Sequence, residues 1–249
     1  MQPTPDFKLI RPENALSDFV FCFSSMRHFS NTHQAVVIPN GRIDLIFSKT
    51  ADGRIRVALL GLETMPKYPN QEFSDFCSVS FNPLATEYVF GFPVAGIINS
   101  GMLMPDDFWG FQPNDLNDFE GFCRKMSVKI KSLLPKETDV RKRRLFELIF
   151  ASNGELPIAE LAEKISWSPR RINRYFNSQF GLPLKSYCKI LRFQASLSHI
   201  RDGNLYPQLN FTDQSHFIKE ITKLSGVSPK ELHKNKNGRF LQFLVYGEK

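Results

Sequence analysis

Short stretches of β-forming residues, separated by turn residues, fill the chain from about residue 34 to residue 101. Asn40-Gly41 and Asp52-Gly53 lie between neighbouring stretches, and both pairs tolerate the positive φ of tight hairpins. Short strands with this punctuation predict an antiparallel sheet that curls into a barrel or a sandwich. The expected strands cover residues 35–38, 43–47, 54–60, 73–81 and 88–98.

Helical spacing begins after residue 114. Apolar residues recur at three- and four-residue steps over residues 116–134, which predicts an amphipathic helix. Asn117 and Glu120 have the spacing of a capping box at its start, and Pro135 ends it. The broad apolar stripe of this helix is the most plausible surface for a homodimer, although packing on its own domain explains the stripe equally well.

The remaining sequence predicts helices alone, so we expect two domains. A β-rich domain covers residues 1–139, including a linker at 136–139, and an all-α domain covers residues 140–249. The fold class is therefore two-domain α+β. The expected helices of the second domain cover residues 140–152, 157–165, 168–181, 184–202 and 212–226, with a short last helix from residue 228.

Charge separates the same two domains. Residues 1–139 carry 13 basic against 16 acidic residues, a net charge of −3, whereas residues 140–249 carry 19 against 9, a net charge of +10. A basic half of this kind is typical of a nucleic-acid-binding module, and a plain solvated surface is the alternative. With 42% hydrophobic and 23% charged residues, the chain is neither disordered nor of low complexity.

Three features that the sequence lacks indicate the cellular compartment: a membrane span, a signal peptide and close cysteine pairs. No apolar run approaches the roughly 18 residues of a membrane span, and the first residues lack the layout of a signal peptide. The cysteines form none of the close pairs of a zinc site, so we expect reduced, buried thiols. These are Cys22, Cys77, Cys123 and Cys188. We therefore expect a soluble cytoplasmic protein that has no membrane partner.

Residues 156–165 and 168–181 predict two short helices joined by a tight turn, as in a helix-turn-helix. Ser168 is an N-cap residue, Pro169 suits the first helical position, and Gly181 stops the second helix. Arginine offers a donor pair to guanine and asparagine offers a donor and an acceptor to adenine, so this helix is a candidate major-groove reader. Its candidate DNA-binding residues are Arg170, Arg171, Asn173, Arg174 and Asn177.

Motifs along residues 145–233 carry a resemblance to a known family. They are Leu161-Ala162, Ser168, Arg174-Tyr175-Phe176, Phe180-Gly181-Leu182-Pro183, Tyr187, Arg192, Ala195, Asn210-Phe211-Thr212-Asp213-Gln214-Ser215-His216-Phe217 and Ser225-Gly226-Val227-Ser228-Pro229. At these spacings the region resembles the DNA-binding domain of AraC/XylS-type transcription regulators. The resemblance implies two helix-turn-helix motifs joined by the long helix 184–202, each with a recognition helix in the major groove of an operator. The DNA contacts it implies for the second recognition helix are Gln214, Ser215, Ile218 and Lys219.

The second motif departs from the family pattern. Only residues 204–211 precede its recognition helix, and Pro207 interrupts them, which predicts a turn or two in place of a supporting helix. Asn210 stands where the family prefers glycine, and asparagine is the best substitute in a left-handed conformation. We therefore expect the first recognition helix to make the firmer DNA contact. His216 lacks a partner at metal-ligand spacing and is expected to pack or to form a hydrogen bond.

The N-terminal half also resembles the β-rich sensor domains of some AraC-type regulators. The residues concerned are 37–47, Phe81-Asn82-Pro83, Tyr88, Phe92-Pro93-Val94 and Asp107-Phe108-Trp109-Gly110. This resemblance implies a small cupin-like barrel that binds an effector or mediates dimerisation, without naming a ligand. Metal-dependent cupins use a His-x-His pair, but only His28 and His33 precede residue 199 and they form no such pair. We expect no enzyme activity, no metal and no cofactor.

The leading hypothesis is a sequence-specific transcription regulator. Its expected partners are double-stranded DNA, a small-molecule effector, a second copy of the chain and RNA polymerase. The alternatives are a ligand-binding or protein-interaction module with degenerate DNA binding, and a metalloenzyme built on the barrel. The sequence leaves open the effector, the operator and the choice between activation and repression.

Overall fold

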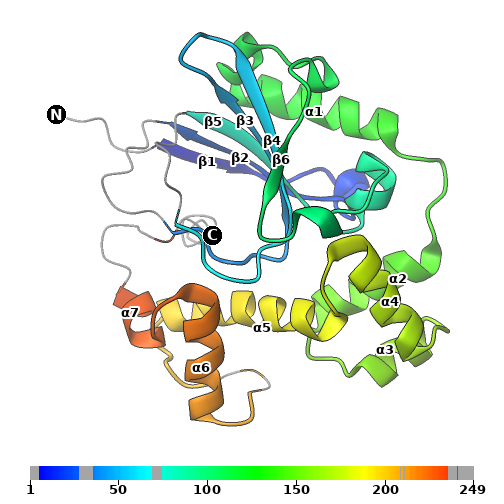
Figure 1. Cartoon of the computed structure of the whole chain (residues 1–249), viewed down its shortest axis with the longest axis vertical. Coiled ribbons are helices and arrows are strands. Elements are labelled where there is room, and N and C mark those ends of the chain that lie inside the picture. The colour runs from blue at the N-terminus through cyan, green and yellow to red at the C-terminus, as the bar shows by residue number, and fades with distance from the viewer. Residues whose placement is uncertain are drawn as a thin grey trace. The chain divides into compact units, whose positions relative to one another are not determined.

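The computed structural model describes residues 6–27, 36–68, 75–207, 209, 211–234 and 240 (Figure 1). The chain divides into two compact units, each assembled from separate stretches of sequence. Unit 1 comprises Met1–Thr32, Arg42–Gly61 and Asn70–Thr138, and unit 2 comprises His33–Gly41, Leu62–Pro69 and Asp139–Lys249. Within the described ranges, no helix is both long enough and apolar enough to cross a membrane.

Unit 1 is built on a six-stranded antiparallel sheet. The strands are β1 (Asp6–Ile10), β2 (Val20–Arg27), β3 (Ile43–Lys49), β4 (Ile55–Leu60), β5 (Phe76–Phe81) and β6 (Gly101–Leu103), in the spatial order β1-β2-β5-β3-β4-β6. β1 and β6 form the two edges, so the sheet is open and the expected closed barrel is wrong. The Asp52-Gly53 hairpin is confirmed, because Gly53 has a φ of 79° in the turn between β3 and β4.

Two of the expected strands are wrong. Residues 36 and 37 form only single bridges, in which Val37 pairs with Lys67 and Val36 with Phe240, so Asn40-Gly41 closes no hairpin. Residues 88–98 fall instead into a π-helical turn, Thr86–Phe90, and a 3-10 turn, Ala95–Ile97. Gly91 has a φ of 74° and ends the first turn, and Pro93 soon follows, so this apolar run is broken before it can extend. Residues 35, 73 and 74, and also His28 and His33, lie outside the described residues.

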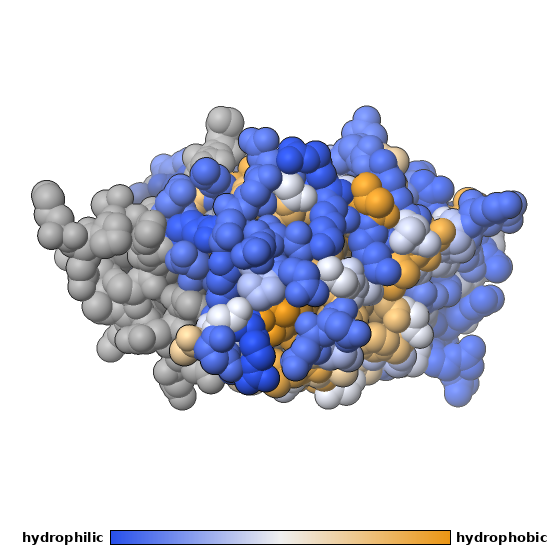
Figure 2. Space-filling view, turned by 90° about the horizontal axis from the view of Figure 1, so that it is seen from above, coloured by the Kyte–Doolittle hydropathy of each residue, from blue (hydrophilic) through white to orange (hydrophobic). Residues whose placement is uncertain are grey.

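The helix α1 (Phe119–Leu133) packs its apolar stripe on the sheet of its own unit. Phe122 lies 5.3 Å from both Phe47 of β3 and Phe111, measured between ring centroids, and all three side chains are fully buried. The capping box forms one turn earlier, between Gln112 and Asp115, rather than at Asn117 and Glu120. Most of the stripe is buried within unit 1, which favours the alternative that it packs on its own domain, and the homodimer stays a prediction. Hydrophilic residues dominate the face shown in Figure 2, and hydrophobic ones gather there in small groups.

Unit 2 is a helical unit arranged along one long central helix. Its helices are α2 (Val140–Ala151), α3 (Ile158–Lys164), α4 (Pro169–Phe180), α5 (Leu184–Arg201), α6 (Gln214–Ser225) and α7 (Pro229–Lys234). The central helix is α5, which contacts α4, α6 and α7 (Figure 1). Its core includes the aromatic rings of Phe146, Phe176, Phe180 and Tyr187, whose neighbouring centroids lie 5.2–6.0 Å apart.

Two short segments from the first half of the chain complete unit 2. Residues 36–41 and 62–68, named here the brace, are joined by a pair of backbone hydrogen bonds between Val37 and Lys67, of 2.8 and 3.0 Å. The buried Tyr187 hydroxyl of α5 donates to the Gly41 carbonyl at 3.0 Å, and the Gln194 amide donates to the Pro39 carbonyl. The folded DNA-binding candidate is therefore not one continuous stretch of sequence.

Candidate nucleic-acid interface

The helix α4 is sharply defined at both ends by its own sequence. The Ser168 hydroxyl caps its start by accepting a hydrogen bond from the Arg171 amide at 3.2 Å, and Pro169 occupies the first turn. Gly181 ends the helix with a φ of 75°. α3 precedes it across a short turn in which Ser166 has a φ of 54°. The predicted pair of short helices with a tight turn is therefore present.

The two faces of α4 differ in chemistry. Ile172, Tyr175, Phe176 and Phe180 are buried, whereas Arg170, Arg174 and Asn177 are exposed at positions that share one face. The guanidinium groups of Arg170 and Arg174 form no ion pair within the described residues. They are therefore available to an external partner.

Three of the predicted α4 residues, Asn173, Asn177 and Arg171, differ in their surroundings from Arg170 and Arg174. The Asn177 amide nitrogen donates to the backbone carbonyl of Asn173 at 2.9 Å, and the Asn173 side chain is half-buried. The guanidinium of Arg171 lies 4.3 Å above the ring of Trp167, beside α4 rather than in line with Arg170. The structure thus brings together Arg170 and Arg174 and sets Arg171 apart from them.

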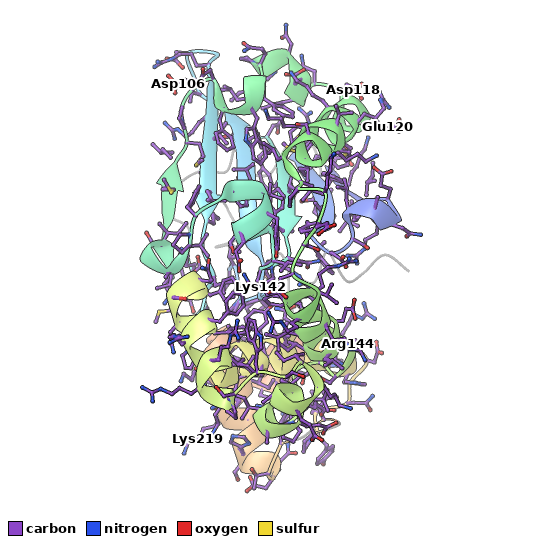
Figure 3. All side chains as sticks on the ribbon, turned by 90° about the vertical axis from the view of Figure 1, so that its right-hand side faces the viewer. Asp106, Asp118, Glu120, Lys142, Arg144 and Lys219 are labelled. Carbon is purple, nitrogen blue, oxygen red and sulfur yellow. The ribbon has the colours of Figure 1, made fainter. Side chains whose placement is uncertain are left out.

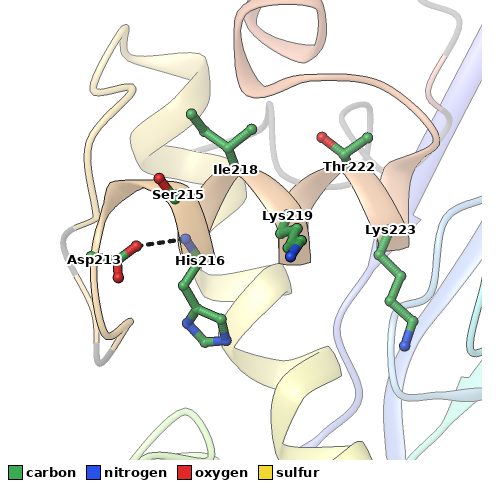
Figure 4. A pocket seen from close by; sticks show the side chains of 7 residues that line it. All are labelled: Asp213, Ser215, His216, Ile218, Lys219, Thr222 and Lys223. Atoms are coloured by element: carbon green, nitrogen blue, oxygen red, sulfur yellow. Dashed lines mark hydrogen bonds between the residues drawn. The ribbon is translucent and has the colours of Figure 1, made fainter.

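The helix α6 carries a second set of predicted contacts. The Asp213 carboxylate caps it by accepting from the His216 amide at 2.8 Å (Figure 4). Ser215, Ile218 and Lys219 line a shallow hollow of about 730 Å³ along its exposed side, together with Thr222 and Lys223. Gln214 is different, because its amide donates to the Leu205 carbonyl at 2.9 Å and its side chain is half-buried.

A loop supports α6 in place of a regular helix. Among residues 204–211 the described ones form no helix, and both Gln208 and Asn210 lie outside the described residues. The ring of Phe211 packs edge-on to Phe217 at 5.1 Å. Lys189 of α5 forms an ion pair with Glu220 of α6 at 3.0 Å, which ties the helix to the centre of the unit. The Thr212 backbone amide donates to Nδ1 of the His216 ring at 3.4 Å.

Arg42 and Asp44, in the stretch 37–47 that resembles the sensor domains, form hydrogen bonds within unit 1. Asp44 accepts from the Ser80 hydroxyl, and Arg42 donates to the Asn82 amide oxygen at 2.7 Å. The described residues contain no group of three or more His, Cys, Asp or Glu side chains placed to hold a metal ion.

Sequence reasoning overlooked the start of α2. Arg141 and Lys142 lie over the rings of Trp167 and Tyr175, next to α4, although some 30 residues separate them in sequence from that helix. The signal was present as the unbroken basic run 141–144. Residues 141–144 were counted in the charge of the domain but not placed beside the recognition helix.

Comparison with known proteins gives matches among solved structures alone, since no family model and no curated protein matches the chain. The crystal structure of ToxT from Vibrio cholerae O395 aligns over 94% of this chain and 98% of its own, with 10% identity and a TM-score of 0.46. The unsaturated fatty acid-bound wild-type ToxT of Vibrio cholerae strain SCE256 aligns over 82% of this chain and 87% of its own, with 12% identity and a TM-score of 0.43. At these low TM-scores, any functional assignment depends on the residues of the chain itself.

Proposed function

We propose that the chain is a sequence-specific, DNA-binding transcription regulator of the AraC/XylS type. The observation that carries the proposal is the exposed Arg170–Arg174 pair on a capped twelve-residue helix whose opposite face is buried. In the major groove, each guanidinium offers two parallel donors to the O6 and N7 atoms of guanine. A rigid, capped helix keeps these donors in register with the base edges.

The helix α6 makes the second contact with DNA in this proposal. Lys219 pairs with a phosphate, the Ser215 hydroxyl reaches either a phosphate or a base, and Ile218, which is 41% exposed, packs on a thymine methyl group. Gln214 is reassigned from base contact to holding the loop at Leu205.

Unit 1 has the role of sensing or dimerisation in this proposal. An effector of unidentified chemistry binds it, the active form is a homodimer, and RNA polymerase is a further partner. Most of the α1 stripe is buried, which favours another surface for the homodimer. The competing function, a ligand-binding or interaction module with degenerate DNA binding, predicts no preference for any duplex sequence.

The test begins with selection of a preferred duplex from a random-sequence pool. Fluorescence anisotropy then measures binding to that duplex and to a scrambled one at fixed salt. Arg174→Ala should weaken binding to the selected duplex by about 1–3 kcal/mol and relax the preference at one position. Lys164→Ala removes an exposed cation of α3 that is paired with Glu160, and it should change little.

Lys219→Ala ranks the two helices. Its loss should be smaller than that of Arg174→Ala and similar on both duplexes, because a phosphate contact carries no sequence information. A larger change of sequence preference for Lys219→Ala would reverse the ranking. Failure of the wild-type chain to prefer any duplex would favour the interaction module.

A further inference from the structure

The strand β6 is an open edge of the sheet in unit 1. Within the described residues, β4 is the one strand that pairs with it. Met102 is 41% exposed and Leu103 is 68% exposed, so both apolar side chains lie open to solvent. In Figure 3, Asp106, shortly after β6, lies on the other side of unit 1 from Asp118 and Glu120 at the start of α1. The exposure of β6 leaves its outer side open to a partner strand.

The two edges of the sheet differ in charge. β1, the opposite edge, carries the exposed side chains of Asp6 and Lys8. Charges at an edge keep further strands from pairing with it. In contrast, residues 99–105, around β6, contain no charged side chain. An apolar, uncharged edge is prone to aggregate unless a specific partner strand covers it. β6 is thus the edge suited to a partner.

The backbone of β6 alternates between groups that bond to β4 and groups that point outward. The Met104 N–H donates to a carbonyl of β4 at 2.9 Å, and the Ser100 carbonyl accepts from the amide of Gly61, just after β4, at 3.0 Å. Because bonding alternates along an antiparallel pair, Gly101 and Leu103 direct their N–H and C=O groups outward. These outward groups are the donors and acceptors that a partner strand can use.

This edge is complementary to a second copy of itself. When two β6 strands lie antiparallel about a two-fold axis at Met102, Gly101 of each copy stands opposite Leu103 of the other. Both residues point their N–H and C=O groups outward, so each pair exchanges both of its hydrogen bonds. Pairing ends at Pro105, which has no N–H, and at Asn99, whose φ is 53°. We propose that the chain forms a homodimer by pairing two β6 edges in this register. This inference rests on the homodimer of the proposed function and names its surface.

The side chains of the edge support the same register. The space beside Gly101 is filled by Leu60 of β4, whose Cδ2 lies 2.6 Å from the place where a Cβ of residue 101 would stand. Leu103 of the other copy lies opposite Gly101 and on the same face, so it packs against Leu60. On the other face of the sheet, the two Met102 side chains meet at the axis. The pairing therefore covers the exposed apolar side chains of both copies.

Sedimentation equilibrium of the full-length chain tests the contact. Leu103→Lys places a charge at the edge, and because both copies change, the dissociation constant of the dimer should rise roughly tenfold or more. Val128→Lys is the matched control on α1, since Val128 is 69% exposed, and it should leave the constant unchanged. Loss of the dimer in Val128→Lys but not in Leu103→Lys would overturn the proposal in favour of α1.

Disulfide cross-linking, followed on non-reducing gels, tests the register. Opposite residues that share no hydrogen bond have Cα atoms about 4.5 Å apart, so Met102→Cys should link the two copies under mild oxidation. Leu103→Cys should not, because the two residues 103 would lie about 8 Å apart, beyond the reach of a disulfide. The four natural cysteines are buried, so the wild type should stay unlinked. Equal cross-linking at both positions would overturn the proposed register.

The possible results keep this inference distinct from the proposed DNA binding. A wild-type dimer that Leu103→Lys leaves intact would overturn the β6 contact. A wild type that stays monomeric would also overturn it, and would leave β6 to a strand of another protein. DNA binding is judged separately, by whether the wild-type chain prefers the selected duplex over the scrambled one.

Discussion

Replacing Gly154 with alanine should separate two helices that the fold requires to touch. Gly154 follows α2 with a φ of 73°, and an added Cβ would lie 2.7 Å from the carbonyl oxygen and 2.8 Å from the Cα of Cys188 in α5. These are backbone atoms, so no side-chain rotation relieves the overlap. The left-handed conformation costs alanine about 1–2 kcal/mol, and overpacking of a filled core adds about 1–3 kcal/mol. Gly154→Ala should therefore lower the free energy of unfolding by about 2–5 kcal/mol.

Gly203→Ala is the matched control in the same unit. Gly203 has a φ of 87°, but an added Cβ would meet nothing closer than His233 Cε1 at 3.7 Å, so the expected cost is the conformational part alone. Urea unfolding followed by Trp167 emission reports on unit 2 in a Trp109→Phe background, because the chain has two tryptophans and Trp167 alone then emits. The expected result is a lower midpoint for Gly154→Ala than for Gly203→Ala, at similar slopes. Equal midpoints would refute the argument that backbone contact at Cys188 decides the cost.

Two further predictions concern buried groups. Tyr187→Phe removes the hydroxyl that donates to the Gly41 carbonyl and leaves that buried carbonyl without this hydrogen bond. The free energy of unfolding, measured by urea titration, should therefore fall by about 1–3 kcal/mol. An unchanged urea midpoint would mean that the hydrogen bond adds nothing to stability. Burial raises the pKa of Cys22 and of Cys188 to about 11, so alkylation of these thiols in the folded chain should stay slow at pH 8 and accelerate only towards pH 11. Because the pKa of each thiol is higher in the folded than in the unfolded chain, the stability that these protonated thiols contribute should be complete below pH 9 and should decline as the pH rises further. Rapid alkylation at pH 8 without unfolding would contradict the raised pKa.

Local signals in the sequence predicted the elements that local chemistry controls. Ser168, Pro169 and Gly181 bound α4 because capping depends on a few adjacent residues, and the Asp52-Gly53 turn needs only a glycine that accepts a positive φ. The helical phase of residues 170–180 correctly separated buried from exposed side chains. The helical spacing predicts which side chains are exposed, but it does not reveal which group an exposed side chain contacts.

Sequence reasoning is weakest where distant residues decide the outcome. Nothing local reveals the ring of Trp167 beneath the Arg171 guanidinium or the Leu205 carbonyl that accepts from the Gln214 amide, and the DNA contacts expected of both residues stay predictions. Closure of the sheet depends on whether β1 meets β6, two strands that are far apart in sequence. Residues 36–38 have the apolar pattern of a buried strand. Val36 and Ile38 are indeed buried, but in unit 2 rather than in the sheet.

The brace places a condition on how the chain is made. Its hydrogen bond from Tyr187 to Gly41 spans 146 residues, and ribosomes add roughly 5–20 residues per second. Residues 36–41 therefore leave the ribosome about 7–30 s before the helix that will cover them, with Ile38 and Leu62, both fully buried in the finished fold, still open to water. Unit 2, the DNA-binding candidate, therefore cannot complete its fold from its C-terminal residues alone. It closes onto segments made first, so an N-terminal truncation or a domain exchange cut at residue 139 removes part of the C-terminal core.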